Sequence, residues 1–411
     1  MKSINLGVIG LGQRGFGMLK GFMLFDNVNV VALSDNYEKH LLRASEEVEK
    51  TKGNKPALYE DYEQLLNDKN VQVVYIASSW DEHIRMAIKS MKKGIITAIE
   101  VGGAYDVEEC WELVRAYEET KTPIMLMENC CFDYFELLAT TLARRKMLGE
   151  IVHCHGSYSH DLRPEILGGN LNHHYRLLNY MKRNCENYPT HEFGPIAKIL
   201  NINRGNRIMT LSSLASKGVG IEELLKEGKN PDTTLNGVKF NQGDLVHTMI
   251  KCANGETVTL TLDTTLPRFY SREFTVRGTK GLCMQETDLV MIEGTETMKE
   301  SWDASQTLKE AFGNAKAYKH LAPDIWQNIT EEEANAGHGG MDYLMIREFL
   351  KCIDEGKEFP IDVYDAATWM CITALSEQSV ALSGAPVPVP DFTRGKWIMR
   401  EPKDVVPLKL D

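Results

Sequence analysis

The sequence lacks the features that mark several large classes of protein. It has no apolar run of about 18 residues or more, which excludes a membrane-spanning helix. Its nine cysteines are scattered without a C-x-x-C or zinc-binding spacing, which argues against a disulfide scaffold. Acidic residues outnumber basic residues, and the net charge of -12 argues against nucleic acid or an anionic membrane as the main partner. The first strand begins too early for a signal peptide, so we expect a cytoplasmic protein.

What is present is a chain of 411 residues with 43% hydrophobic and 25% charged residues, which is typical of two or three globular domains. Up to about residue 130, short apolar runs alternate with helical segments. The apolar runs cover residues 4–9, 28–33, 71–76, 95–99 and 123–127. One helical segment follows the glycines and ends near Phe25, and two others cover residues 82–93 and 107–120. This alternation predicts an α/β Rossmann domain with a parallel, doubly wound sheet.

The pattern changes after residue 130. A helix over 135–147 precedes strand-like segments over 151–160, 208–214, 246–252, 257–262 and 274–277, and helices are expected over 341–354 and 364–382. Asn254-Gly255 separates two alternating runs and indicates a hairpin. We therefore predict an α+β domain with a large, mostly antiparallel sheet. The expected boundaries are 1–129 for the Rossmann domain and 130–411 for a domain that binds substrate and forms oligomers.

The first strand leads into Gly10-Leu11-Gly12-Gln13-Arg14-Gly15, a G-x-G-x-x-G motif that opens a helix. Gly10 permits the tight turn, Gly12 lets the backbone approach a pyrophosphate, and Gly15 allows close packing of helix and strand. Asp35 ends the second strand, 20 residues (35 − 15) after the last glycine. A carboxylate there accepts hydrogen bonds from the ribose and repels a 2′-phosphate, which favours NAD over NADP. The alternative is that Asp35 caps a helix.

The ends of the next parallel strands are also informative, because ligands bind at that edge of the sheet. They read Ser78-Ser79-Trp80-Asp81-Glu82-His83, Glu100-Val101-Gly102-Gly103 and Glu128-Asn129-Cys130-Cys131. With the second domain, they resemble the glucose–fructose oxidoreductase and inositol dehydrogenase superfamily. Sugar dehydrogenases of that superfamily carry Glu-Lys-Pro with a catalytic lysine, whereas this chain has Glu100-Val101-Gly102. The missing lysine argues against a plain dehydrogenase.

Longer stretches resemble the NAD-dependent glycoside hydrolases of the α-N-acetylgalactosaminidase type. They begin with Glu128–Cys131, Gly149–His153 and Tyr158–Arg163, and continue with Tyr188–His191, Gly194-Pro195, Asn201–Gly205, Leu266–Arg272 and Gly337–Asp342. Two segments depart from the family. Its Trp-Glu-Trp-His is here Trp80-Asp81-Glu82-His83, and its arginine segment begins with tryptophan rather than Tyr175. Both segments line the expected pockets, so the sugar itself stays open.

The resemblance implies a tightly bound NAD that is recycled within each turnover. In such enzymes the sugar is oxidised at C3, which acidifies the C2 proton for removal by a base. The C1 substituent is then eliminated, water adds, and the hydride returns to C3. Such a reaction needs a base for the C3 hydroxyl, a base for C2 and stabilisation of the enolate.

The resemblance also implies roles for individual residues. His191, at the start of a helix, is the candidate base for the C3 hydroxyl. Tyr158 resembles the C2 base, and a cation such as Arg176 is expected beside it to lower its pKa. Glu128 either protonates the leaving group or orients Asn129 and the ribose. The implied NAD contacts are Gly10, Gly12, Arg14, Gly15, Asp35, Trp80, His83, Glu100, Val101, Asn129, Tyr188 and Tyr270. The implied substrate contacts are Tyr158, Arg176, Tyr188, Pro189, Thr190 and His191.

Some features permit other interpretations. His153 and His155, with His173-His174, lack a completing ligand, so no metal is expected. Cys130-Cys131 could be redox-active, but burial is the favoured interpretation. An NAD-dependent sugar or cyclitol dehydrogenase is the alternative function, and a non-enzymatic NAD-sensing protein is a further one. The expected partners are a small carbohydrate and, by family resemblance, further copies of the chain.

Overall fold

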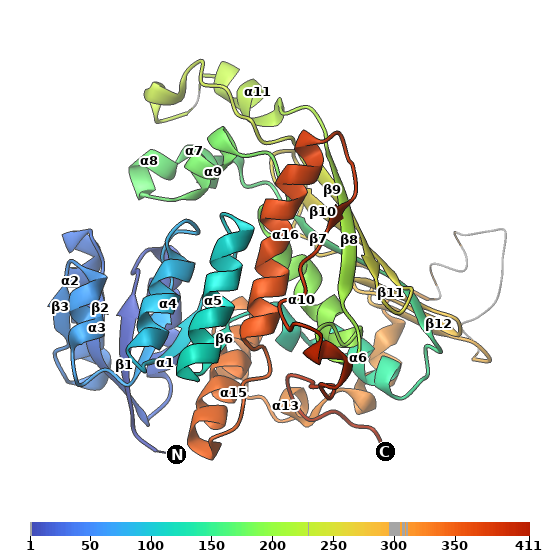
Figure 1. Ribbon diagram of the computed structural model, residues 1–411, viewed down its shortest axis with the longest axis horizontal. Helices are drawn as coiled ribbons and strands as arrows, with labels where there is room; N and C mark the ends of the chain where they lie inside the picture. Colours follow the sequence, from blue (N-terminus) through green and yellow to red (C-terminus); the bar gives the residue numbers. More distant parts are fainter. Residues whose placement is uncertain (1, 229, 296–304, 306–308, 310) are drawn as a thin grey trace. The chain divides into compact units, whose positions relative to one another are not determined.

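A computed structural model describes residues 2–228, 230–295, 305, 309 and 311–411 (Figure 1). The chain forms two compact units, one of Met1–Asn129 with Ile329–Cys371 and the other of Cys130–Asn328 with Ile372–Asp411. The first division falls after Asn129, where the sequence analysis places it. The segment Ile329–Cys371, however, packs with the first unit, whereas the sequence analysis assigns it to the second domain.

The first unit contains a six-stranded parallel sheet, which confirms the predicted doubly wound Rossmann fold (Figure 1). Its strands, in the order β3-β2-β1-β4-β5-β6, are Ala57–Tyr59, Val28–Ser34, Ile4–Ile9, Val73–Ile76, Ile96–Ile99 and Ile124–Leu126. The connecting helices are α1 (Gln13–Met23), α2 (Glu38–Lys52), α3 (Tyr62–Asn67), α4 (His83–Lys92) and α5 (Val107–Thr120). All four residues of β4 are buried, because helices cover both faces of a parallel sheet.

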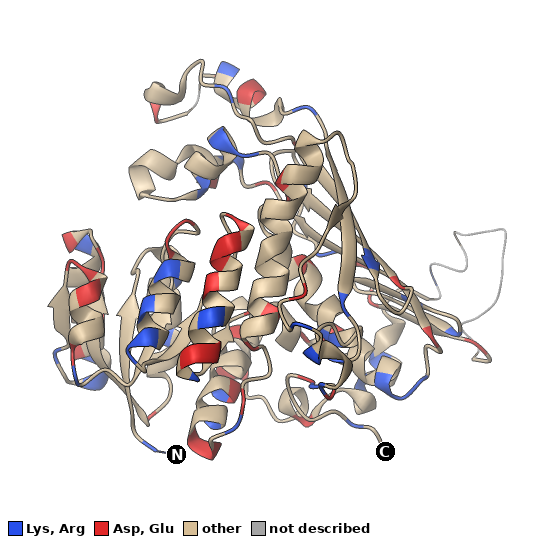
Figure 2. Cartoon of the chain, in the orientation of Figure 1, with Lys and Arg blue, Asp and Glu red and all other residues tan. Residues whose placement is uncertain are grey.

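Polar side chains cap the start of α3 and α5, whereas α1, α2 and α4 begin without a side-chain cap. Asp106 accepts a hydrogen bond from the Glu109 N–H, and the Glu109 side chain reaches back, so a capping box begins α5. Figure 2 shows mostly acidic residues along α5 and basic residues along α4. These charges occupy the exposed faces, while Leu113 and Val114 are fully buried.

The segment Ile329–Cys371 contains α14 (Glu331–Ala334), the 3-10 turn η4 (His338–Gly340), α15 (Met341–Glu355) and the first part of α16 (Val363–Ala381). Helix α15 joins the first unit because its apolar face packs on α1. The Phe25 and Tyr343 rings stack with centroids 4.9 Å apart. Ile346 fills the space above Gly21, where a Cβ would lie 2.9 Å from its Cδ1 atom. An amphipathic helix can bury its apolar face on a distant part of the chain, and the sequence of the helix does not indicate which part.

The second unit contains an eight-stranded sheet in the order β13-β12-β11-β7-β10-β9-β8-β14. These strands are Leu289–Ile292, Gly281–Met284, Thr275–Gly278, Ile151–Ser159, Thr257–Asp263, Leu245–Cys252, Ile208–Ala215 and Val387–Pro388. All neighbours are antiparallel except β7 and β10, which confirms the mostly antiparallel prediction. The Asn254-Gly255 turn joins β9 to β10 as predicted, and Gly255 has a φ of 106°.

Helix α10 (Pro189–Ile199) packs on β7 and β10 of this sheet, and α6 (Tyr134–Arg144) packs on α10. The other helices of this unit include α7 (Arg163–Leu167), α8 (Gly169–Asn172), α9 (Arg176–Lys182), α11 (Gly220–Lys226) and α13 (Asp324–Gln327). In β9 the residues alternate between buried and exposed, so the opposite face is open to solvent. Met209, Leu214 and Met249 are exposed there. The expected homo-oligomer stays a prediction.

The described residues contain no helix that is both long and apolar enough to cross a membrane. All nine cysteines are buried and free of disulfides, including the adjacent Cys130 and Cys131. This confirms the expectation that Cys130-Cys131 is buried.

The glycine turn generates a prediction with a matched control. A Cβ on Gly15 would lie 1.9 Å from the Gly10 carbonyl oxygen, whereas a Cβ on Gly17, in the same helix, meets nothing within 4 Å. Gly15→Ala should lower the free energy of unfolding by about 2 kcal/mol or more. Gly17→Ala should leave it unchanged or raise it by up to about 1 kcal/mol. Equal urea denaturation curves for the two variants would contradict the close packing.

Candidate active site

The glycine turn between β1 and α1 has the backbone geometry of a dinucleotide-binding loop. Gly10 has a φ of 84°, and a Cβ there would lie 2.5 Å from the Ala77 carbonyl oxygen. Gly12 is the N-cap of α1, and no side chain caps this end. The first N–H groups of the helix are therefore available to a phosphate, and nothing lies within 4 Å of the place where a Gly12 Cβ would stand. These features fit a dinucleotide.

Asp35 fastens this loop to the end of β2. Its Oδ2 accepts a hydrogen bond from the Leu11 N–H at 2.7 Å, and its Oδ1 accepts one from the Tyr37 N–H at 2.9 Å. The N-cap of α2 is Tyr37, so Asp35 is not the cap of that helix. Oδ2 also contacts His40 Nδ1 at 3.3 Å, whereas Oδ1 keeps a second lone pair. Asp35 can therefore hold the glycine loop and still accept a ribose hydroxyl.

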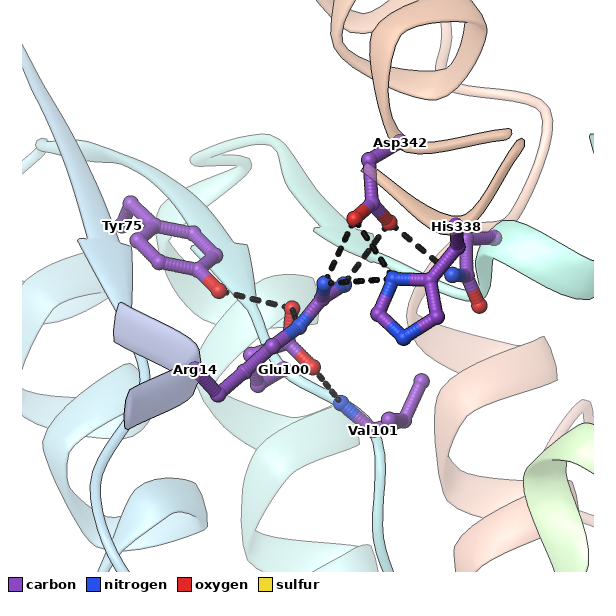
Figure 3. A network of polar contacts seen from close by, with 7 residues as sticks. Arg14, Tyr75, Glu100, Val101, His338 and Asp342 are labelled. Atoms are coloured by element: carbon purple, nitrogen blue, oxygen red, sulfur yellow. Dashed lines mark hydrogen bonds and ion pairs between the residues drawn. The ribbon is translucent and has the colours of Figure 1, made fainter. Parts of the chain in front are cut away.

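A network of charged side chains surrounds Arg14, the second residue of α1 (Figure 3). Its guanidinium donates to both oxygens of Asp342, at 2.7 and 3.0 Å, and to Glu100 Oε1 at 3.1 Å. Asn129 donates its amide to Asp342 Oδ1 at 2.9 Å, and His338 Nδ1 lies 2.8 Å from Asp342 Oδ2. One buried carboxylate of α15 thus organises residues from α1, the end of β6 and η4.

The electrostatics of the network keep Asp342 charged and the phenol of Tyr75 protonated. Burial alone would raise the pKa of Asp342, but the hydrogen bond of His338 and the charge of Arg14 lower it below the ordinary value. Burial and the neighbouring Glu100 raise the pKa of Tyr75, which donates its hydroxyl to Glu100 Oε1 at 2.7 Å. The network therefore sets one arginine between two carboxylates.

The position of the missing lysine has its own backbone geometry. Val101 is buried, and its N–H donates to Glu100 Oε2 at 3.2 Å. The next residue, Gly102, has a φ of 146°, which proline cannot adopt. A Cβ on Gly102 would lie 2.3 Å from the Trp80 indole. The backbone at Gly102 and the packing of Trp80 therefore differ from what a Glu-Lys-Pro sequence would allow.

Two further residues of the expected site in this unit, the NAD contact His83 and the catalytic candidate Glu128, are fully buried. His83 begins α4 and is fully buried, and this burial lowers its pKa to about 4, so the ring is neutral. Glu128 follows β6, is fully buried, and donates its N–H to the Leu126 carbonyl at 3.0 Å. Its two alternative roles stay open.

The second unit brings together three of the predicted catalytic residues. Tyr188 is the N-cap of α10, and His191 lies in its first turn. The Tyr158 ring, from β7, has its centroid 4.4 Å from that of Tyr188 and 5.6 Å from that of His191. The Tyr188 and His191 rings are 4.8 Å apart. Pro189 and Thr190, between them, are buried.

Arg176 lies over this cluster, as the sequence analysis expects. Its guanidinium carbon is 4.9 Å from the Tyr188 ring centroid and 5.7 Å from that of Tyr158, and its Nη2 donates to the Tyr158 hydroxyl at 3.4 Å. The expected lowering of the Tyr158 pKa is wrong for this geometry. Burial raises the pKa of Tyr158 by more than Arg176 lowers it. Glu165 contributes to this result, because its carboxylate pairs with Arg176 Nε at 2.9 Å.

Tyr270 lies in the second unit, beside the same cluster. Its ring centroid is 5.3 Å from that of His160, which in turn is 4.9 Å from that of Tyr158. Its hydroxyl accepts a hydrogen bond from Arg272 Nη1 at 3.1 Å. Burial and the charge of Arg176 lower the pKa of His160 to about 4, so this imidazole is neutral.

Sequence reasoning missed several residues of these two clusters. Tyr75, His338 and Asp342 join the Arg14 network, and Glu165 and His160 join the Tyr158 cluster. The stretch Gly337–Asp342 carries part of the family resemblance, and this was the signal available for His338 and Asp342. Nothing in the sequence points to Tyr75, because it lies within a strand whose other residues are apolar.

Comparison with known proteins identifies families for two parts of the sequence. Residues 4–127 match the oxidoreductase family with an NAD-binding Rossmann fold. Residues 134–399 match the family described as glycosyl hydrolase 109, C-terminal domain. An alpha-N-acetylgalactosaminidase of Tannerella forsythia is 36% identical over 97% of this chain and 88% of its own length. One of Shewanella oneidensis is 35% identical over 99% of this chain and 88% of its own length.

Solved structures share the fold at low sequence identity. A levoglucosan dehydrogenase in complex with NADH and levoglucosan has a TM-score of 0.68 at 19% identity, covering 95% of this chain and all of the other. A scyllo-inositol dehydrogenase of Lactobacillus casei with bound NAD(H) has a TM-score of 0.64 at 14% identity, covering 94% of this chain and 99% of the other. The fold and the glycine loop define an NAD-binding Rossmann protein with a dehydrogenase-type α+β domain. Within this class, the chain belongs to glycosyl hydrolase family 109.

The Arg14 network predicts how stability depends on Asp342. Asp342→Asn should lower the free energy of unfolding by about 3 kcal/mol, because it leaves a largely buried arginine without its main partner. The pKa of Asp342 is lowered in the folded state, so its contribution is present above the ordinary aspartate pKa and is lost as pH falls through the lowered value. Urea denaturation at about pH 7 and about pH 3 should show a smaller difference between variant and wild type in acid.

The control for this experiment is an exposed ion pair. Glu82→Gln removes the partner of Arg85, whose side chain is 65% exposed, and should change stability by less than about 1 kcal/mol. A difference between Asp342→Asn and wild type that is no larger than this, or that does not shrink in acid, would contradict the prediction.

Proposed function

We propose that the protein is a glycoside hydrolase that acts on an N-acetylgalactosaminide or a related hexoside and recycles a tightly bound NAD. The observation that carries this proposal is the gathering of Tyr158, Tyr188, His191 and Arg176 in the unit that matches the family 109 domain. The names of the relatives supply the sugar. Buried Val101 supports the same conclusion, because it stands where the related dehydrogenases have a catalytic lysine.

The glycine loop and Asp35 would hold the dinucleotide, and NAD bound there would supply a hydride acceptor and donor for C3 of the sugar. His191, in the first turn of α10, takes the proton of the C3 hydroxyl. Tyr188 lies against His191 and positions the sugar.

Tyr158 removes the C2 proton, which the neighbouring ketone makes acidic. Its phenolate is stabilised by Arg176, whose Nη2 reaches the hydroxyl. Because burial raises the pKa of Tyr158, only a small fraction is ionised at neutral pH. We therefore expect the rate of C2 deprotonation to rise with pH. Glu128 either protonates the leaving oxygen or orients Asn129.

The test of this function uses the purified protein and a panel of aryl glycosides in deuterated water. We expect release of the aglycone, deuterium at C2 of the sugar and no net NADH. NADH formed in proportion to substrate without aglycone would identify a sugar or cyclitol dehydrogenase instead. Binding of NAD with neither reaction on any sugar of the panel would identify an NAD-sensing protein. Either result would overturn the proposal.

A variant tests the base at C2. Tyr158→Phe should lower kcat by a factor of about 100 to 10,000 and abolish the exchange of deuterium into C2, because no phenolate can form. The wild-type rate should rise with pH up to about pH 7, and this rise should be absent in the variant. Tyr180→Phe is the control, since Tyr180 is also buried in this unit and its hydroxyl hydrogen-bonds to Thr264 and Asn187. Its kcat should stay within about threefold of wild type. Exchange retained in Tyr158→Phe would show that another group is the base.

A further inference from the structure

Two glutamates without a role in the proposed reaction flank the Tyr188–His191 turn in the sequence. Glu186 is 0% and Glu192 1% exposed, and their side chains are within hydrogen-bond reach of each other. Among the described residues neither forms an ion pair, and three of their four carboxyl oxygens lack a donor in good geometry. The fourth, Glu186 Oε1, accepts the Tyr188 N–H at 3.2 Å.

Two ionised carboxylates cannot persist in such a place, because each would be desolvated and would repel the other. A single shared proton removes one of the two buried charges and the repulsion between them. The protonated carboxyl becomes a donor to its neighbour, and the pair keeps one negative charge at the positive end of the 11-residue helix α10. Burial accordingly raises the pKa of Glu186 to about 7 and raises that of Glu192 well above its ordinary value.

We propose that Glu186 and Glu192 share one proton, and that this acid pair holds the Tyr188–His191 turn on strand β7. The two glutamates are positioning residues. The proposal depends on the proposed function only because that function makes this turn catalytic.

The pair is joined to both tyrosines of the cluster through their backbones. Glu186 accepts the N–H of Tyr188, while Glu192 faces the backbone of Tyr158 and of Thr261 on β10. Helix α10 and β7 approach closely, since a Cβ on Gly156 would lie 2.3 Å from the Glu192 carbonyl oxygen. The contact between the rings of Tyr158 and Tyr188 therefore depends on the state of the carboxyl pair below them.

Among the described residues, no cation pairs with either glutamate. Cys185 precedes Glu186, and burial keeps its thiol protonated by raising its pKa. From α16, Ser376 accepts the Glu186 N–H at 2.8 Å, and Glu377 is paired with Arg183 at 2.6 Å. From the sheet the facing residues are Tyr158 and Thr261, both neutral at pH 7, and α10 itself contributes His191, the next residue to Glu192.

The sign of the pH dependence follows from the raised pKa values. The folded protein binds the shared proton more tightly than the unfolded chain does. The contribution of the pair to stability is therefore complete below the ordinary glutamate pKa and falls as the pH rises through that of the folded pair. Above this pH, two buried charges push the turn away from β7, and activity should fall with stability.

Glu192→Gln tests the proposal, because its amide replaces the shared proton permanently and donates to Glu186. Infrared difference spectra of the wild type at neutral pH should show a protonated carboxyl that is absent in the variant. Thermal unfolding should lose less stability between about pH 6 and pH 9 in the variant than in wild type. At about pH 6, kcat/KM should stay within about threefold, and its alkaline decline should move to higher pH.

Glu192→Leu should lower kcat/KM about tenfold or more, because Glu186 is left charged or without its partner. If Glu192→Leu does not fold, the results for Glu192→Gln test the proposal without it. Glu109→Gln is the control for the spectra, since burial also raises the pKa of Glu109 to about 7, in the other unit. Its carboxyl band should disappear while the band of the pair and the pH profile of kcat/KM persist.

A wild type with no protonated carboxyl beyond that of Glu109, or equal pH profiles of unfolding in wild type and Glu192→Gln, would overturn the proposal. The spectra and the unfolding curves do not require activity. They therefore distinguish failure of the acid pair from failure of the proposed glycosidase function.

Discussion

The close packing of helix α10 on strand β7 is the constraint on which the second unit's polar cluster depends. Gly156 lets the Glu192 carbonyl approach the strand to a distance that any side chain would block. With the helix seated there, Tyr188 and His191 at its first turn meet Tyr158 on the strand. Proline at the first position of α10 needs no N–H, so this helix begins at the catalytic turn without a capping side chain.

In the first unit, ion pairs hold the polar cluster together. Its cluster is assembled around Asp342, a buried carboxylate that binds Arg14 with two hydrogen bonds and Asn129 with one. Glu100 binds the same arginine from the end of β5. A buried charge is stable only when its partners are fixed, so α15 has to pack on α1 before the network can form. The packing of Phe25 on Tyr343 therefore contributes to the geometry beside the glycine loop.

Much of the fold followed from local patterns. The helix Val107–Thr120 was predicted with the bounds that the structure has, and a capping box of Asp106 and Glu109 marks its start. The strands β3 and β14 were not predicted, since two or three residues are too short to show a period. The parallel pairing of β7 with β10 was also missed, because the chain between them runs through several helices. Ring contacts among Tyr158, Tyr188 and His191 were expected only through the family resemblance.

The amino-acid sequence by itself determined the glycine turn, Asp35, the alternation of strands and helices, and the absence of a lysine after Glu100. These are local properties, set by backbone geometry and by the spacing of apolar residues. Only the tertiary structure decided that Ile329–Cys371 joins the first unit, that Arg14 lies between two carboxylates, and that burial raises the pKa of Tyr158 despite Arg176. Burial and charge pairing depend on residues far apart in the chain, and a local sequence pattern does not indicate which of them come into contact.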